Sequence, residues 1–264
     1  MNSHDLAPAT PAGEVSGTVH TVSLIGGGPG AWDLITVRGM NRLREADVIL
    51  ADHLGPTSEL DQLCDLSTKE VVDVSKLPYG RQVAQSRTNE LLVEYARSGK
   101  KVVRLKGGDP YVFGRGFEEL EYLAHHGIAC EVIPGVTSAI SVPGAAGVPI
   151  TQRGVVHCFT VISGHLPPGH PNSLLDWDAL AKTGGTLSII MGVKNAGRIA
   201  EALTRGGLPP HTPVAIIQEG TTQAQRSVRC TLDTLGEVMV SEEIKPPAVY
   251  VIGEVAGLGQ TAVN

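Results

Sequence analysis

Short runs of apolar, β-branched residues recur along the chain and alternate with longer segments of helical periodicity. Nine of these runs predict strands, at residues 22–25, 48–50, 71–74, 102–105, 129–133, 159–162, 187–190, 214–217 and 249–252. Four segments between them predict helices, at residues 36–45, 88–98, 117–126 and 196–205. Continuous apolar runs of this length are typical of strands covered on both faces. The sequence therefore predicts an α/β protein with largely parallel sheets.

The chain has 264 residues, which at about 150 residues per domain corresponds to two small domains or one large one. A break near residues 134–141 favours two α/β domains, over residues 20–135 and 136–258, with a cleft between them. Residues 1–19 are rich in Ala, Pro, Gly, Ser and Thr and lack a basic segment followed by an apolar one. They are predicted to be a disordered tail, not a signal peptide, and residues 259–264 a second tail.

Charge and cysteine content exclude several classes of protein. Lys and Arg total 21 against 27 Asp and Glu, a formal net charge of −6, which argues against general nucleic-acid binding because phosphate backbones require a basic surface. No apolar stretch approaches the ~20 residues that span a bilayer. The four cysteines are far apart and lack the spacing of a zinc site, so we expect reduced thiols in a cytoplasmic protein. The histidines show no ligand pattern, and no metal site is predicted.

Five glycine-containing loops directly follow predicted strands. The first, residues 26–31, can be matched to the dinucleotide motif G-x-G-x-x-A, with Asp52 as the ribose-binding acid. A nicotinamide-dependent oxidoreductase is therefore an alternative, although Pro29 removes an amide donor from such a loop. In the second, KGGDPYVFGRG, the glycines allow close approach of a ligand, and Asp109 either accepts hydrogen bonds from it or caps a helix. With the loops at 133–138, 190–192 and 218–221, they predict a site between the domains.

Several of these segments together resemble the tetrapyrrole methylases. They are GGGPG, VRLKGGDPYVFGRG, IPGVTSAISVPGAAGVPITQRG, TLSIIMG and PPAVYVIGEV, and the resemblance covers residues 22–258. Within that family, RLKGGDPYVFGRG together with VPITQRG is most similar to the members that methylate uroporphyrinogen III twice, giving precorrin-2 for sirohaem and cobalamin. The resemblance implies S-adenosylmethionine bound in a cleft between two α/β domains, and a homodimer.

The resemblance also implies roles for individual residues. Cofactor contacts fall on Pro29, Gly107, Gly108, Asp109, Val112, Thr137, Ser138, Met191 and Gly220. Asp52 corresponds to the proton acceptor of the family, and Lys76 to its proton donor. The sulfonium methyl is already activated, so the enzyme mainly holds donor and pyrrole carbon in a reactive geometry. A proton must then leave the substrate, and Asp52 is the candidate base.

The implied substrate is a macrocycle with many carboxylates, for which guanidinium and ammonium groups are the strongest partners. Arg104, Lys106, Arg115 and Arg153 are the predicted substrate ligands. Because the whole chain is acidic, we expect a locally positive cleft on a negative surface. The alternatives left open are a later precorrin methyltransferase, a diphthine synthase, the nicotinamide-dependent oxidoreductase and a tetrapyrrole-binding protein without catalysis.

Overall fold

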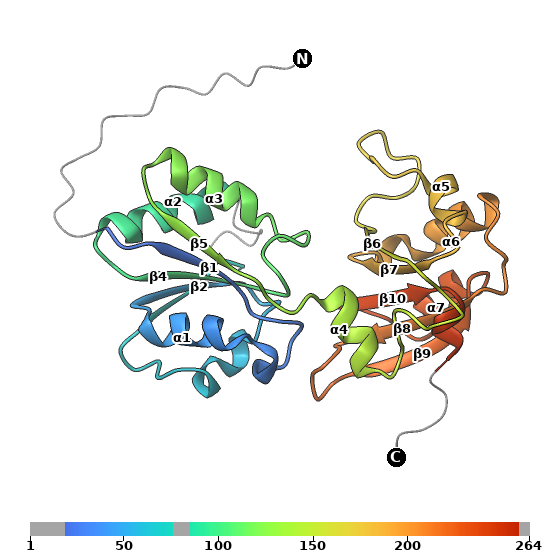
Figure 1. Cartoon of the computed structure of the whole chain (residues 1–264), viewed down its shortest axis with the longest axis horizontal. Coiled ribbons are helices and arrows are strands. Elements are labelled where there is room, and N and C mark those ends of the chain that lie inside the picture. The colour runs from blue at the N-terminus through green and yellow to red at the C-terminus, as the bar shows by residue number, and fades with distance from the viewer. Residues whose placement is uncertain (1–18, 76–84, 259–264) are drawn as a thin grey trace.

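The computed structural model describes residues 19–75 and 85–258, in which ten strands form two five-stranded sheets (Figure 1). The strands are β1 (Val22–Gly26), β2 (Val48–Ala51), β3 (Glu70–Asp73), β4 (Val102–Lys106), β5 (Cys130–Ile133), β6 (Phe159–Ser163), β7 (Thr186–Ile190), β8 (Pro213–Gln218), β9 (Arg226–Thr231) and β10 (Ala248–Ile252). The helices are α1 (Val37–Glu45), α2 (Gln85–Arg97), α3 (Gly116–His125), α4 (Ser138–Ala145), α5 (Trp177–Ala181), α6 (Ala196–Arg205) and α7 (Leu235–Ser241). Short 3-10 segments are η1 (Trp32–Leu34), η2 (Thr57–Gln62), η3 (Val193–Asn195) and η4 (Glu254–Gly257).

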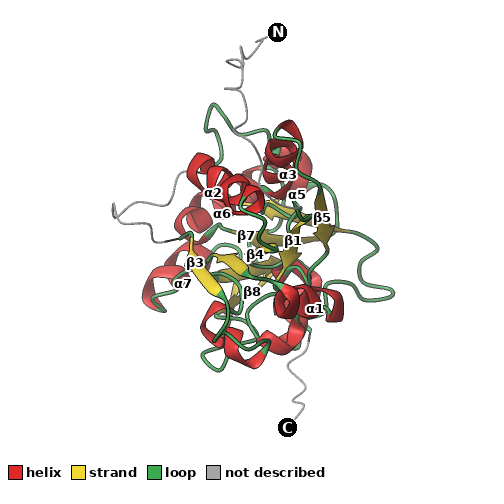
Figure 2. Cartoon of the chain, turned by 90° about the vertical axis from the view of Figure 1, so that its left-hand side faces the viewer, coloured by secondary structure: helices red, strands yellow, loops and turns green. Residues whose placement is uncertain are grey.

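The first sheet has the strand order β3-β2-β4-β1-β5, and every neighbouring pair is parallel. Leu24 and Leu50 pack with Leu92 under α2 and α3 on one face, whereas Ile25 packs with Leu43 of α1 on the other. Figure 2 shows strands of this sheet between helices α2 and α3 on one side and α1 on the other. The prediction of parallel strands is thus confirmed for this sheet, and its three inner strands, β2, β4 and β1, are buried at every position. Parallel strands also bring the loops after β1, β2, β4 and β5 to one edge.

The second sheet has the order β6-β7-β10-β8-β9 and is mostly antiparallel. Only β6 and β7 run parallel, while β10 is antiparallel to both β7 and β8, and β8 to β9. The prediction of largely parallel strands is therefore wrong for this half. The cause is β9, an edge strand whose sequence RSVRCT lacks a continuous apolar run and which the sequence analysis missed. A short turn joins β8 to β9, and so short a connection requires antiparallel neighbours.

Helix α4 connects the two sheets, following β5 in the chain and packing on the second sheet (Figure 1). Ser188 of β7 donates a hydrogen bond of 2.6 Å to the carbonyl of Ala139 in this helix. The helix was not predicted, because SAISVPGA contains Pro143 and has no amphipathic period. Since α4 packs with the strands that follow it, we propose that the domain boundary lies at 135/136, just before it. No helix of the described residues is long and apolar enough to cross a membrane.

Candidate active site at the joined strand-end loops

The loops after β1, β4 and β5 are joined by backbone contacts. Gly28 and Gly108 exchange two hydrogen bonds, of 3.2 and 2.6 Å, and the amide of Gly27 donates to the carbonyl of Lys106 at 2.7 Å. A Cβ on Gly135 would lie 2.1 Å from the carbonyl oxygen of Gly108. Only residues without a side chain allow backbones to approach this closely. The glycines predicted to face a ligand therefore also hold the three loops together.

The same contacts argue against a dinucleotide site in the first loop. A pyrophosphate loop offers free amides and leads directly into a helix. Here the amides of Gly27 and Gly28 are used by the protein, and α1 begins only at Val37, after the separate segment η1. The geometry thus gives no support to the nicotinamide-dependent alternative.

Asp109 ties the second loop to the loop after β5. Its Oδ1 accepts a hydrogen bond of 2.8 Å from the amide of Tyr111, and its Oδ2 accepts one of 3.0 Å from the amide of Gly135. A carboxylate offers about four acceptor positions, so each oxygen keeps capacity for a ligand. Val112 closes the same turn, because its amide donates to the carbonyl of Asp109 at 3.3 Å.

Loops of the second sheet contact the joined loops of the first sheet. The amide of Ala31, two residues after Pro29, donates to Thr221 Oγ1 at 3.1 Å. Gly220 is buried, and a Cβ there would lie 2.3 Å from a methyl carbon of Val142 in α4. The start of α4 in turn approaches the first sheet, since the Cβ position of Gly108 lies 3.8 Å from both the Thr137 Cα and the Ser138 amide nitrogen. Chain from both halves therefore converges around the predicted cofactor residues.

Met191 extends this edge along the second sheet. Ile190, the last residue of β7, pairs with Val249 of β10, and the adjacent Ala248 pairs with Gln218, the last residue of β8. The register therefore places Met191 at the same sheet edge as the loop containing Gly220. Its side chain is half-exposed.

Backbone strain is concentrated in these loops. Six non-glycine residues in the described ranges have positive φ: Phe113, Arg115, Met191, Glu219, Thr221 and Glu243, with values from 48° to 70°. All but Glu243 lie in the strand-end loops. A left-handed non-glycine residue costs about 1–2 kcal/mol, and such strain clusters at ligand sites. Its distribution supports a functional site at this edge.

Replacing Gly135 with alanine is expected to weaken binding of S-adenosylhomocysteine at least tenfold, about 1.4 kcal/mol. The added methyl group would be forced against the backbones of Gly26 and Gly108, separating the loops. Isothermal titration calorimetry measures the effect. Gly144→Ala is the matched control, because a Cβ there meets nothing within 4 Å and the residue lies in α4. Unchanged affinity in Gly135→Ala would contradict the prediction that the cofactor binds at the joined loops.

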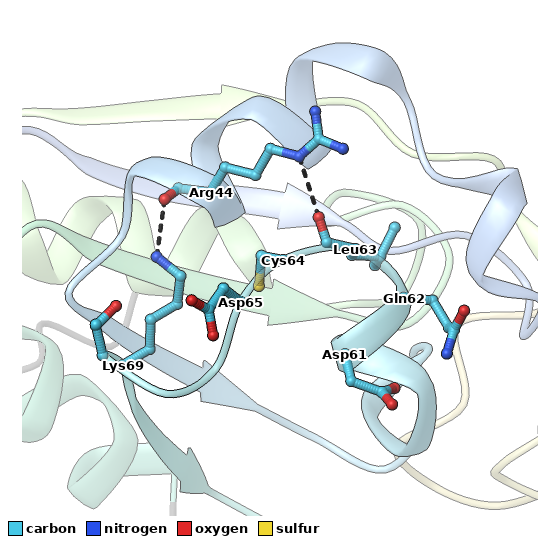
Figure 3. A pocket seen from close by; sticks show the side chains of 8 residues that line it. Arg44, Asp61, Gln62, Leu63, Cys64, Asp65 and Lys69 are labelled. Carbon is cyan, nitrogen blue, oxygen red and sulfur yellow. Dashed lines mark hydrogen bonds between the residues drawn. The ribbon is translucent and has the colours of Figure 1, made fainter.

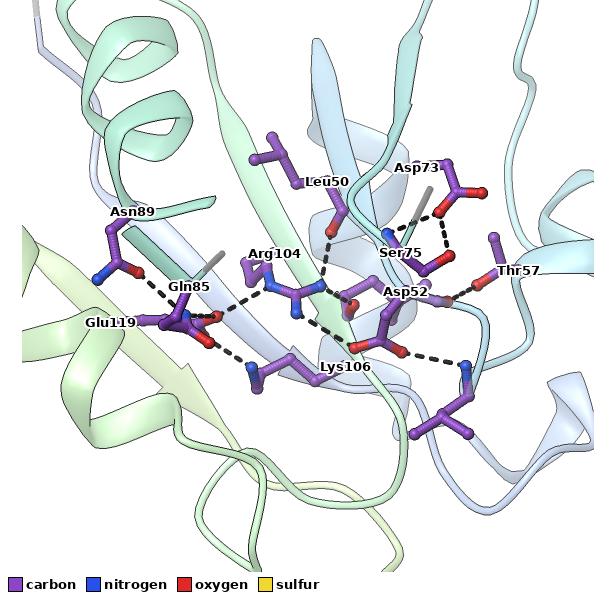
Figure 4. Close-up of polar contacts among 12 residues, drawn as sticks. Leu50, Asp52, Thr57, Asp73, Ser75, Gln85, Asn89, Arg104, Lys106 and Glu119 are labelled. Atoms are coloured by element: carbon purple, nitrogen blue, oxygen red, sulfur yellow. Dashed lines mark hydrogen bonds and ion pairs between the residues drawn. The ribbon is translucent and has the colours of Figure 1, made fainter. Parts of the chain in front are cut away.

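Asp52 follows β2 at this edge, and its side chain is held by two contacts (Figure 4). Its Oδ1 accepts a hydrogen bond of 3.1 Å from the amide of Leu54, and its Oδ2 lies 3.2 Å from Arg104 Nη2. The side chain is 22% exposed, so part of the carboxylate remains open. A Cβ on Gly107 would lie 2.6 Å from the Leu54 Cβ, which places this loop directly against the predicted cofactor loop. Lys76, the predicted proton donor, lies outside the described residues.

Arg104 and Lys106 lie inside the protein. They are 5% and 3% exposed, and both pair with Glu119 of α3, at 3.1 and 2.9 Å. Burial lowers the pKa of Lys106. Burial would raise the pKa of Glu119, but the two cations hold it below its ordinary value. We therefore assign Arg104 and Lys106 no contact with substrate. The sequence analysis missed Glu119, which is fully buried.

The other two predicted substrate ligands are exposed. Arg115, in the loop that begins α3, forms an ion pair of 2.6 Å with Glu118, and this pairing raises the pKa of Arg115. Arg153 lies in the turn bridged by Gln152 and Val156. Arg115 uses Nε and Nη2 for Glu118, but both arginines are exposed, so a ligand can reach them from solvent.

The second loop and the first turn of α3 also expose aromatic rings. Tyr111, Phe113 and Phe117 are each about half-exposed, in a chain with only 4% aromatic residues. The rings of Tyr111 and Phe117 meet edge to face, with centroids 6.1 Å apart. Exposed aromatic rings next to glycine-rich backbone are suited to a ligand that itself carries aromatic rings.

A hollow of about 460 Å³ lies on the first domain at the end opposite the joined loops (Figure 3). Arg44, Cys64, Asp65 and Lys69 are among its lining residues. Lys69 precedes β3, so the hollow lies near the amino ends of the strands, away from the joined loops. No group of three His, Cys, Asp or Glu in the described ranges could hold a metal ion.

Comparisons with known proteins agree with this geometry. A family model described as tetrapyrrole (corrin/porphyrin) methylases matches residues 21–236. The chain is 44% identical over 244 residues to the S-adenosyl-L-methionine-dependent uroporphyrinogen III methyltransferase of Methanosarcina barkeri, a match covering 92% of this chain and 95% of that protein. It is 44% identical over 237 residues to the siroheme synthase of Actinobacillus succinogenes, covering 90% of this chain but 48% of that protein.

A solved structure is similar over both sheets. The uroporphyrin-III C-methyl transferase of Thermus thermophilus, complexed with S-adenyl homocysteine, matches with a TM-score of 0.74 and 38% identity. The match covers 89% of this chain and 93% of that one. Because the alignment includes almost the whole chain, the similarity covers both sheets and is not limited to one loop or one domain.

Proposed function

The chain belongs to the tetrapyrrole (corrin/porphyrin) methylase family, and we propose that it converts uroporphyrinogen III to precorrin-2 by two successive methylations. S-adenosylmethionine is the methyl donor, and the reaction belongs to sirohaem and cobalamin biosynthesis. The observation that carries the proposal is the convergence of strand-end loops from both sheets, at the segments that resemble the family.

The joined loops fit S-adenosylmethionine, whose sulfonium supplies an activated methyl group. Glycine backbone at 108 leaves room for close approach, since a Cβ there would meet nothing nearer than 3.8 Å, and Asp109 retains acceptor capacity for an ammonium group or ribose hydroxyls. Thr137 and Ser138 lie against Gly108. The residues proposed to hold the cofactor are Pro29, Gly107, Gly108, Asp109, Val112, Thr137, Ser138, Met191 and Gly220.

We assign Asp52 the role of proton acceptor during methylation. Its partly open carboxylate lies beside the cofactor loop and is held by Arg104, at a position where it can accept a proton from a bound substrate. Arg115 and Arg153 are the proposed ligands of substrate carboxylates, since both are exposed. The half-exposed rings of Tyr111 and Phe117 are proposed to contact the macrocycle. Lys76 as proton donor, a homodimer and a cytoplasmic location stay predictions.

Mass spectrometry of the reaction product tests the function. Purified protein with uroporphyrinogen III and S-adenosylmethionine is expected to add two methyl groups to the substrate. Independently, S-adenosylhomocysteine at 100 times its Kd should stabilise the protein by about 2.7 kcal/mol. Binding without methyl transfer would favour a later precorrin methyltransferase or a diphthine synthase. Absence of saturable binding would refute the proposal.

A further inference from the structure

Arg104 is fixed from three directions inside the first sheet (Figure 4). Its Nε donates to Glu119 Oε1 at 3.1 Å, and its Nη1 donates to the carbonyl of Leu105 at 2.8 Å. Its Nη2 donates to Asp52 Oδ2 at 3.2 Å. All three nitrogens are therefore committed to protein acceptors. A planar guanidinium held in this way has little freedom to turn.

The buried charges balance only when Asp52 is included. Arg104 and Lys106 contribute two positive charges, and Glu119, which has no exposed surface, contributes one negative charge. Ionised Asp52 supplies the second negative charge at the open end of the cluster. A buried charge without a partner is costly, so the side chain of Asp52 is the partner that completes this cluster.

Glu119 is itself anchored to a second helix. Gln85 of α2 donates to Glu119 Oε1 at 3.0 Å and to Asn89 Oδ1 at 3.0 Å. Lys106 holds the other Glu119 oxygen at 2.9 Å. The contacts therefore run from α2 and α3 through Arg104 to the end of β2, where Asp52 begins its loop.

We propose that Arg104 is a positioning residue for Asp52, an inference that rests on the proposed base role of Asp52. The guanidinium holds Oδ2, and the amide of Leu54 holds Oδ1. Together they fix the orientation of the carboxylate beside the cofactor loop. Arg104 touches no reacting atom. Its effect on turnover is exerted through Asp52, with Glu119 as the group that holds Arg104 in place.

A double-mutant cycle tests this coupling, using Arg104→Met, Asp52→Asn and the double variant. Arg104→Met leaves Lys106 and Glu119 as a balanced buried pair, so folding is expected to survive. A misplaced catalytic group costs up to about 100-fold, and we expect a 10- to 100-fold loss of kcat with little change in the Kd of S-adenosylhomocysteine. In the Asp52→Asn background the same change should cost less than about threefold, because coupled residues are not additive.

Arg104→Lys keeps the charge but not the fork of donors, and provides a second variant if Arg104→Met folds poorly. We expect a kcat between those of Arg104→Met and the unchanged protein, with KM affected less than kcat. Equal losses in both backgrounds would overturn the positioning role while leaving Asp52 as the base. Full activity in Asp52→Asn would instead overturn the base role, and the positioning inference with it.

Discussion

Replacing Asp52 with asparagine is expected to reduce kcat for methyl transfer by about 10²- to 10⁴-fold, the usual contribution of a general base. The amide keeps the shape of the side chain and an oxygen for the Leu54 amide, but it cannot accept the proton that leaves the substrate. Among the described residues, the hydrogen bonds of the Asp52 side chain are to Leu54 and Arg104, and none is to a glycine of the joined loops. The Kd of S-adenosylhomocysteine is therefore expected to stay within about twofold, as measured by calorimetry.

Asp65→Asn is a matched control for this substitution. Asp65 accepts a hydrogen bond of 2.9 Å from the amide two residues later, as Asp52 does, but it lies exposed in the hollow at the end of the first domain opposite the joined loops. Its replacement should leave kcat unchanged. If Asp52→Asn turned over substrate as fast as this control, Asp52 would not be the base.

The sequence predicted the first sheet well because central parallel strands have a strong signal. β1 and β2 are buried at every position, so each appears as an uninterrupted apolar run. Strand β9 was missed for the opposite reason: it lies at a sheet edge, its first two residues are exposed and the other four are only partly buried, so it has no continuous apolar run. The antiparallel pairing of β10 depends on β8 and β9 forming a hairpin, which apolar runs alone do not reveal.

Within the candidate site, the sequence predicted loops that the structure brings together, but it predicted Arg104 and Lys106 as substrate ligands, and both are buried. Arg104 and Lys106 flank Leu105 in a strand that is otherwise apolar. Residues two apart on a strand face the same side, so two cations on one face of a central strand require a buried counter-ion. The spacing of Arg104 and Lys106 could therefore have predicted a buried acidic partner. The counter-ion was not identifiable, because Glu119 in EELEYL has the same pattern as an exposed glutamate on a helix, and only the packing of α3 over β4 distinguishes them.

Replacing Glu119 with glutamine is expected to lower the free energy of unfolding by about 3–5 kcal/mol, the usual effect of removing one partner from a buried ion pair. Arg104 and Lys106 would then share the single carboxylate of Asp52. Denaturant titration measures the loss. The neighbouring Glu118→Gln is the control, because Glu118 is exposed and its pair with Arg115 is worth at most about 1 kcal/mol. Adding Lys106→Met to Glu119→Gln should restore part of the stability.

The loss at Glu119 should also depend on pH in a defined direction. Although burial opposes ionisation, Arg104 and Lys106 lower the folded-state pKa of Glu119 below its ordinary value of 4.5. A carboxylate with a depressed pKa stabilises the fold above its unfolded-state pKa, and this contribution is lost as the pH falls through the folded-state value. The difference in stability between the unchanged protein and Glu119→Gln should therefore be full at pH 7 and shrink below about pH 4.5. A difference independent of pH would show that glutamine destabilises through packing and not through lost charge.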